Sequence, residues 1–273
     1  MYIHPIATRI VKAHDDLLQV ITEAIEQDMV LQGKLPEKSI LAITSKIISY
    51  SQGRLVKKTH SEAQGFTREQ ARAEKHALVA KEAELFLDPH SSKYDLMLTI
   101  TNQTLAVNAG IDESNAHSDG EECFVLWPEH LQETINQLWE RLRAHYQIQH
   151  LGLIVTDSRS FPLRWGVVGT TIGHCGFRAL NNHIGQKDIF GREIHMVQVN
   201  AAEAIGVAAT FEMGEVGETT PLAVVTDAPK VVFTKAVPSA EELAAASISI
   251  ADDAYAPLLT AVAWQKGGKN HDA

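Results

Sequence analysis

Apolar residues recur along this chain with two spacings, one typical of helices and one typical of strands. Where they fall every three or four positions, as at Ile135, Leu138 and Leu142, one face of a helix is predicted to be buried. Residues suited to helix capping, Asp16 and Thr67, precede two of these stretches. Helices are therefore predicted after Asp15-Asp16, from Thr67 to about Leu87, from Glu129 to Tyr146, from Ala201 to Glu212 and in a short stretch after Ser239.

Strands are predicted where β-branched residues alternate with polar ones or form short apolar runs. The run Ser39–Ile48 is nearly uncharged until Lys46, which is typical of a buried strand. Gly166–Gly176 carries four glycines among β-branched residues, which indicates strands with bends or a close approach of another backbone. Further strands are predicted at Ile6–Val11, Leu96–Thr101, Thr104–Asn108, Leu151–Thr156, Pro221–Thr226 and Val231–Thr234, and a polar loop at Gly110–Gly120.

The order of these elements favours one fold class. Helices and strands follow one another without a regular βαβ rhythm, so an α+β fold is predicted rather than a doubly wound sheet. The 273 residues are 45% hydrophobic and 21% charged, which suits a single domain over residues 1–273 or two interwoven subdomains.

Charge and the first residues narrow the possible partners. The formal net charge of −10 gives no global basic surface for nucleic acid, so anionic substrates would be met by local positive charge. The N-terminal residues do not resemble a secretory signal, and no apolar run is long enough to span a membrane. A cytoplasmic location is expected, with Cys123 and Cys175 as reduced thiols.

Three acidic residues are placed where loops meet apolar elements. Asp112 lies in the polar loop, Asp157 follows the predicted strand Leu151–Thr156, and Glu215 follows the Ala-rich helix. Carboxylates at such positions suit Mg²⁺ or Mn²⁺ bound together with phosphate. The alternative is that they are ordinary turn and cap residues.

Positive residues stand in similar places. Lys46, Arg54 and Arg164 lie where predicted strands meet loops, and such side chains can neutralise phosphate oxygens. The alternative is solvated surface charge. No phosphate-binding glycine loop, dinucleotide fingerprint, zinc-protease motif or serine-hydrolase motif is present. The residues alone therefore predict a metal–phosphate site assembled from distant loops.

A series of short segments, taken in order, resembles the coenzyme F-420:L-glutamate ligase family. Each segment is weak, but their order and approximate spacing agree from about residue 4 to residue 226. The segments are Thr44–Ser49, Gly53-Arg54, Gly110–Asn115, Asp157-Ser158, Pro162 with Arg164, Gly185 with Asp188, Gly191-Arg192, Ala208-Ala209 and Met213–Glu215.

The resemblance implies a family-specific α+β fold, an interlocked homodimer, and a GTP-dependent (or ATP-dependent) reaction with two divalent cations, Mg²⁺ or Mn²⁺. Asp112 and Asp157 would hold one cation, and Ser158 and Glu215 the second. Lys46 and Arg164 would be catalytic. The residues implied to contact the nucleotide are His4, Pro5, Ile6 and Ala7 around the base, with Ser45, Lys46, Asn115 and Gly214.

The implied reaction begins with transfer of a γ-phosphoryl group to a carboxylate, giving an acyl phosphate. The α-amine of L-glutamate then attacks, and cations and positive side chains stabilise the charge on the phosphoryl group. The acceptor would be a deazaflavin coenzyme precursor or a folate.

The sequence departs from the family pattern at several positions near the expected acceptor and phosphate pocket. They are Tyr50, Ser160-Phe161, Asn182 and Glu203, where the family usually has Lys, Gly-Arg, Asp and Asp. These departures favour an acceptor other than the deazaflavin. Two further functions stay open: a nucleotide- and metal-binding protein without catalysis, and a metal-dependent phosphohydrolase.

Overall fold

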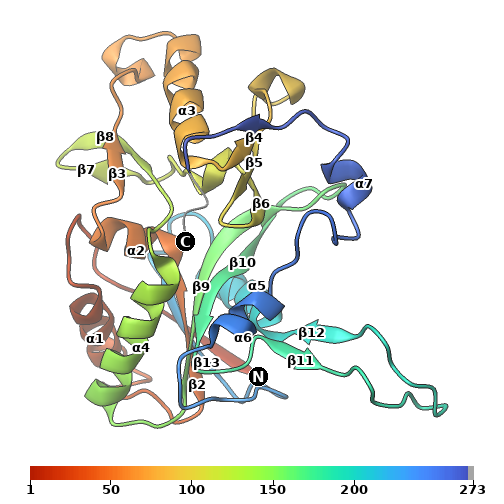
Figure 1. Cartoon of the computed structure of the whole chain (residues 1–273). Helices are drawn as coiled ribbons and strands as arrows, with labels where there is room; N and C mark the ends of the chain where they lie inside the picture. Colours follow the sequence, from red (N-terminus) through yellow and green to blue (C-terminus); the bar gives the residue numbers. More distant parts are fainter. Residues whose placement is uncertain (270–273) are drawn as a thin grey trace.

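Five strands form the main sheet of the structure, a computed structural model that describes residues 1–269 (Figure 1). All neighbouring strands are antiparallel except β2 and β9, which are parallel. This mixed sheet agrees with the predicted α+β class. In spatial order the strands are β1 (Tyr2–Ile6), β13 (Leu222–Thr226), β2 (Ser39–Thr44), β9 (Leu151–Ser160) and β10 (Val167–Cys175).

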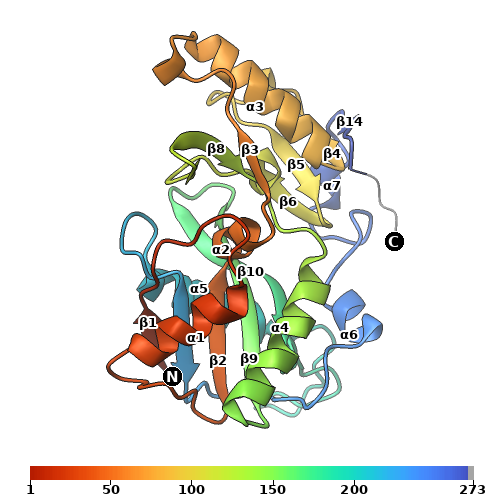
Figure 2. The ribbon, with the colours of Figure 1, turned by 90° about the vertical axis from the view of Figure 1, so that its left-hand side faces the viewer.

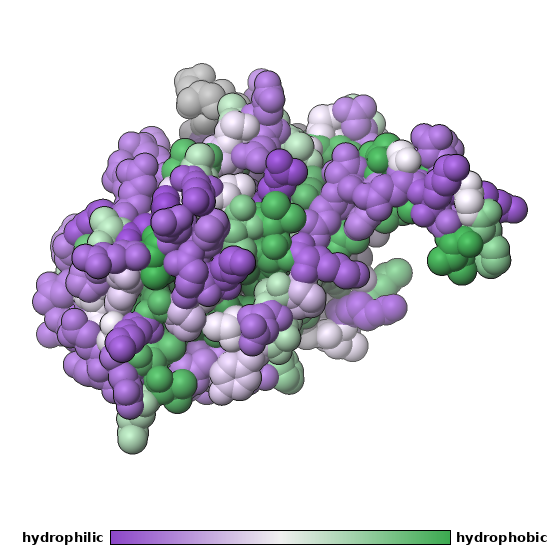
Figure 3. All heavy atoms as spheres, turned by 90° about the horizontal axis from the view of Figure 1, so that it is seen from below, coloured by the Kyte–Doolittle hydropathy of each residue, from purple (hydrophilic) through white to green (hydrophobic). Residues whose placement is uncertain are grey.

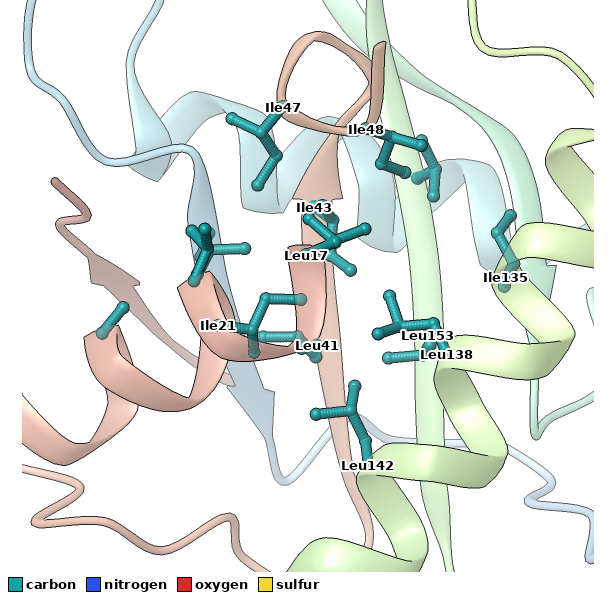
Figure 4. Packing of buried hydrophobic residues seen from close by; sticks show 14 of the residues in the cluster. Leu17, Ile21, Leu41, Ile43, Ile47, Ile48, Ile135, Leu138, Leu142 and Leu153 are labelled. Carbon is teal, nitrogen blue, oxygen red and sulfur yellow. The ribbon is translucent and has the colours of Figure 1, made fainter. Parts of the chain in front are cut away.

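Helices cover both faces of this sheet. On one face lie α1 (Leu17–Gln27), α2 (Ser45–Ser51) and α4 (Leu131–Tyr146), whose apolar residues pack on Leu41, Ile43 and Leu153 (Figure 4). On the other face lies α5 (Ala201–Met213), which packs on Ile40, Ala42 and Ile154. Alternate residues of β2 and β9 thus enter different cores, which explains their nearly uncharged sequences.

The predicted close approach at the glycine-rich segment is confirmed where α5 crosses β10. A Cβ atom on Gly169 would lie 2.0 Å from Thr210 Oγ1, and one on Gly206 would lie 2.3 Å from Thr171 Oγ1. The pairing of β10 with β9 also shifts between Thr171 and Gly173, as expected for a bent strand.

A second unit lies beyond the ends of β2 and α2 (Figure 2). Two small sheets, in the orders β14-β4-β5-β6 and β3-β8-β7, pack with α3 around a separate core that includes Val79, Met97 and Phe124. The elements are β3 (Leu55–Lys57), α3 (Arg68–Glu82), β4 (Leu85–Phe86), β5 (Leu98–Thr101), β6 (Thr104–Val107), β7 (His117–Ser118), β8 (Glu121–Val125) and β14 (Gln265–Lys266).

An arm and a C-terminal segment complete the fold. The chain between β11 (Leu180–Asn182) and β12 (Gln198–Asn200) projects from the body, and apolar side chains lie near its tip (Figure 3). Ile189 and Phe190 are 93% and 83% exposed there. After β13, the chain forms the short helices α6 (Ala240–Ala245) and α7 (Ala256–Leu259) before β14 pairs with β4.

Two predicted strands are wrong in their extent. The strand predicted at Ile6–Val11 lies instead at Tyr2–Ile6, because β1 pairs only with β13 and the chain leaves the sheet after Ile6. Ser39–Ile48 is a strand only to Thr44 and continues as α2, since an uninterrupted apolar run does not distinguish a buried strand from a buried helix.

Other boundaries also differ. The helix from Thr67 ends at Glu82 rather than near Leu87, because Leu85–Phe86 pairs with β5. The strand predicted to end before Asp157 continues to Ser160, paired with β10. No strand forms at Val231–Thr234 beyond a single bridge between Phe177 and Phe233.

The segment Gly110–Gly120, predicted to be a polar loop, contains strand β7. This strand pairs with β8, and neither strand was predicted from the sequence. Cys123 and Cys175 are buried free thiols. Within residues 1–269, no helix combines the length and the apolar character needed to cross a membrane.

Candidate functional site

The candidate site forms where β2 and β9 run side by side towards the second unit. Their parallel pairing places Thr44 opposite Thr156, so the next residues of each strand, Ser45 and Asp157, lie at the same level of the sheet. The Ser45 hydroxyl donates a hydrogen bond of 2.9 Å to Asp157 Oδ1. Two residues separated widely in sequence are therefore joined by strand register.

Asp157 is a partly buried carboxylate with two neutral donors. Besides Ser45, Trp127 Nε1 donates to Asp157 Oδ2 over 2.6 Å. Burial raises the pKa of Asp157 to about 6; these hydrogen bonds oppose the increase, and the nearby Asp112 carboxylate adds to it. A positive charge bound between Asp112 and Asp157 would relieve this repulsion.

Asp112 is held by a lysine and by its own loop. Lys46 Nζ lies 2.7 Å from Asp112 Oδ2 and donates to the Ser114 carbonyl over 2.9 Å. The backbone N–H and hydroxyl of Ser114 donate to Asp112 Oδ1 over 2.7 and 2.8 Å. Burial tends to raise the pKa of Asp112, but Lys46 and Ser114 outweigh it and leave that pKa below its ordinary value.

A serine–glutamate pair lies at the end of α5. Ser158 Oγ donates to Glu215 Oε2 over 2.6 Å, and Asn115 Nδ2 donates to the Val216 carbonyl over 2.7 Å. The Asn115 bond ties the Asp112 segment to the residues that follow α5. The structure thus brings together the predicted residues Ser45, Lys46, Asp112, Asn115, Asp157, Ser158 and Glu215.

The carboxylates of the site do not form one cluster. In the part of the chain that the structure describes, no group of three or more His, Cys, Asp or Glu side chains could by itself hold a metal ion. The available donors are hard oxygens, from Asp112, Asp157, Ser158 and Glu215. Such donors suit Mg²⁺ or Mn²⁺, which bind few carboxylates and complete their coordination with water and phosphate.

The other predicted residues take no part in these contacts. Arg164 is exposed at the turn between β9 and β10, where its Nη1 donates to the Leu163 carbonyl over 2.9 Å. His4 lies in the middle of β1 and pairs with Asp28 at 2.8 Å. Ala7 follows the end of β1, and Gly214 is the C-cap of α5, next to Glu215. Pro5 and Ile6 are within β1.

Two residues of the site were not among the site residues predicted from the sequence. Trp127 follows the apolar residues of β8 and resembles a core residue, yet its indole N–H is the donor to Asp157. Tyr50, at a departure from the family pattern, accepts from the His117 N–H over 3.0 Å and donates to the His117 carbonyl over 3.1 Å. Its hydroxyl therefore fastens the chain that follows Asn115 to α2.

Tyr50→Phe is expected to lower the free energy of unfolding by about 1–2 kcal/mol, because it leaves two backbone groups of His117 without their partner. Urea unfolding measures the loss, and limited proteolysis should show faster cleavage near His117. Tyr94→Phe is the matched control, since Tyr94 is 55% exposed and its hydroxyl makes no hydrogen bond within residues 1–269. Equal stability of the two variants would contradict the role of Tyr50.

Comparisons with known proteins agree on one family. A family model described as F420-0:Gamma-glutamyl ligase matches residues 5–227. The coenzyme F420:L-glutamate ligase of Methanopyrus kandleri is 30% identical over 218 residues, which cover 78% of this chain and 81% of the relative. The ligase of the same name from Archaeoglobus fulgidus is 27% identical over 223 residues, covering 79% and 83%.

A third relative matches a shorter region. The coenzyme F420:L-glutamate ligase of Methanocaldococcus jannaschii is 34% identical over 121 residues, or 44% of this chain and 47% of the relative. All the residues that form the contacts at the ends of β2 and β9 fall within the range matched by the family model. The helices α6 and α7 and strand β14 lie after that range.

Proposed function

This chain belongs to the F420-0:gamma-glutamyl ligase family, and on that premise we propose that it uses a nucleoside triphosphate to join L-glutamate to a carboxylate of a small-molecule acceptor. The observation that supports the proposal is that Ser45, Lys46, Asp112 and Asp157 lie close together. This arrangement combines hard oxygen donors with a cationic side chain, which is what phosphoryl transfer requires.

We assign the oxygen donors of the site to a pair of divalent cations, which would complete their coordination with water and phosphate. Asp112 and Asp157 would hold one, and Ser158 and Glu215 the other. The short distance from Lys46 Nζ to Asp112, 2.7 Å, supports the idea that this position favours positive charge. When bound, the cations would supply neutralisation of phosphate oxygens and polarisation of the phosphoryl group.

The protein's own groups would position the reactants. Lys46 can exchange its contact with Asp112 for a phosphate oxygen, and we assign Ser45, Asn115 and Gly214 to contacts with the nucleotide. The acceptor carboxylate would take the γ-phosphoryl group as an acyl phosphate, which the amine of L-glutamate would then attack with release of phosphate. Arg164 lies in the turn that connects β9, the strand of Asp157, to β10. We assign it to neutralising negative charge during this transfer.

Both acceptors suggested by the sequence, a deazaflavin coenzyme precursor and a folate, present a carboxylate on a flexible arm. The same chemistry would serve either one. Ser160-Phe161 begins the β9–β10 turn, and Phe161 is half exposed, so this departure from the family pattern changes the surface beside Arg159 and Arg164. It favours an acceptor other than the deazaflavin, and the product assay includes both acceptors.

Mass spectrometry of the products tests the proposal. The protein is given GTP or ATP, Mg²⁺ or Mn²⁺, L-glutamate, and in turn the deazaflavin precursor or a reduced folate. A gain of one or more glutamyl units in one acceptor is the expected result. Phosphate release that is indifferent to glutamate, without product, would instead support a phosphohydrolase, and nucleotide binding without either would support a binding protein.

We also propose that the protein is a homodimer in which the arm between β11 and β12 contacts a second copy. The exposure of Ile189 and Phe190 on this projecting arm supports the proposal, because monomers seldom expose several large apolar side chains together. Sedimentation at micromolar concentration tests it, and a monomeric mass would contradict it.

A further inference from the structure

Strand β9 carries a second side chain towards the face of Asp157. Side chains alternate along a strand, so Arg159 emerges on the same face as Asp157, whereas Ser158 points the other way, towards Glu215. An extended strand rises about 3.3 Å per residue, which places the two Cα atoms about 7 Å apart. Arg159 therefore lies within the length of one small substrate from the Asp157 carboxylate.

Arg159 differs from the other partly buried arginines in its contacts. Arg54 binds Glu82 and Glu129, Arg72 binds Asp95, and Arg143 donates to the Lys235 carbonyl. Arg159 is also partly buried, yet its guanidinium has no hydrogen bond and no ion pair to any group within residues 1–269. Its five N–H donors are free of protein partners there.

The nearest carboxylates are committed to other donors. Asp157 accepts from Ser45 and Trp127, and Glu203 accepts from the Thr171 N–H over 2.9 Å. Burial lowers the pKa of Arg159, and the charges of Glu203 and Asp157 oppose that change. The guanidinium stays positive at neutral pH, because its ordinary pKa is far above 7.

The planar donors of a guanidinium match the paired oxygens of a carboxylate or a phosphate, and no group within residues 1–269 occupies those of Arg159. We propose that Arg159 binds an oxyanion of a substrate in the ligase reaction, either a carboxylate of L-glutamate or a phosphate of the nucleotide. The inference rests on the proposed function. It adds a binding residue beside Asp157 that differs from Lys46, already paired with Asp112, and from Arg164, which is exposed at the turn.

The test compares Arg159→Gln, which removes the charge, with Arg159→Lys, which keeps it. Loss of a charged hydrogen-bond donor is expected to weaken binding of one substrate by about 10- to 100-fold, and lysine should recover part of this loss. Calorimetry measures the Kd of GTP with Mn²⁺ and the Kd of L-glutamate directly, and steady-state assays measure each KM against kcat. Arg178→Gln, at an exposed arginine, is the matched control.

Each outcome has a defined meaning. A weaker Kd for L-glutamate alone identifies a carboxylate as the bound group, and a weaker Kd for GTP alone identifies a phosphate. An active ligase in which Arg159→Gln changes neither Kd nor any KM would overturn the inference and leave the proposed function intact. The remaining outcome is that the wild-type protein binds these ligands and Arg159→Gln weakens that binding, but no product forms. This would overturn the proposed function and leave the inference about Arg159 intact.

Discussion

Replacing Asp157 by asparagine is expected to reduce product formation by at least about a hundredfold while the protein stays folded. The carboxylate charge is what a cation and the transferring phosphoryl group require, and loss of one such electrostatic contribution typically costs that much or more. Asparagine has nearly the same shape, and its Oδ1 can accept from Trp127 while its Nδ2 donates to the Ser45 hydroxyl.

The stability of this variant distinguishes a loss of catalysis from a loss of folding. Because burial raises the pKa of Asp157 to about 6, its charged form is disfavoured in the folded protein, and a neutral side chain should not lower the free energy of unfolding. Urea unfolding and the product assay are measured on the same preparation. Asp119→Asn, at an exposed turn between β7 and β8, is the control and should keep full activity. Unchanged turnover in Asp157→Asn would contradict the proposed site.

Replacing Gly110 by alanine is expected to lower the free energy of unfolding by about 2–5 kcal/mol and to reduce activity. Gly110 has φ +71°, a conformation that costs an alanine about 1–2 kcal/mol, and its Cβ atom would lie 2.1 Å from the ring of Trp127. Relief of that overlap costs a further 1–3 kcal/mol or so. The ring would have to move, and its N–H is the donor to Asp157.

Gly120→Ala provides the matched control for this prediction. Gly120 has φ +80°, but a Cβ atom there would meet no atom within 4 Å, so only the backbone cost of about 1–2 kcal/mol applies. The difference in urea unfolding between the two variants measures the overlap with Trp127. If both variants lost the same stability and both kept full activity, contact between Gly110 and Trp127 would not position Asp157.

Local patterns in the sequence were sufficient to predict the helices that pack against the main sheet. Asp16 caps α1 by accepting from Leu18 and Gln19, and the apolar stripe of α4 is buried at Ile135, Leu138 and Leu142. Signals of this kind depend on residues three or four positions apart, so one sequence contains them. The end of a strand depends on pairing with another strand, and the polar residues from Asp157 to Ser160 do not reveal that they pair with β10, so β9 was predicted to stop before Asp157.

The same distinction applies to the site. Asp112, Asp157 and Glu215 could be proposed from their residue types, but their pairing with Lys46, Ser45 and Ser158 depends on strand register and on loops that meet in space. Trp127 could not be proposed at all, because its neighbours in sequence are apolar. Tyr50 stood out in the sequence only as a departure from the family pattern, because its contact with His117 is formed by the fold.

The position of β13 determines when the main sheet can be completed during synthesis. This strand, Leu222–Thr226, lies between β1 and β2, so the first two strands of the chain are never neighbours and cannot form a hairpin. A nascent chain shorter than about 226 residues would leave β1 without its pairing partner and one edge of β2 open. Much of the chain would therefore emerge from the ribosome before its apolar strands can pair. Truncated forms that stop before β13 should require chaperones or aggregate.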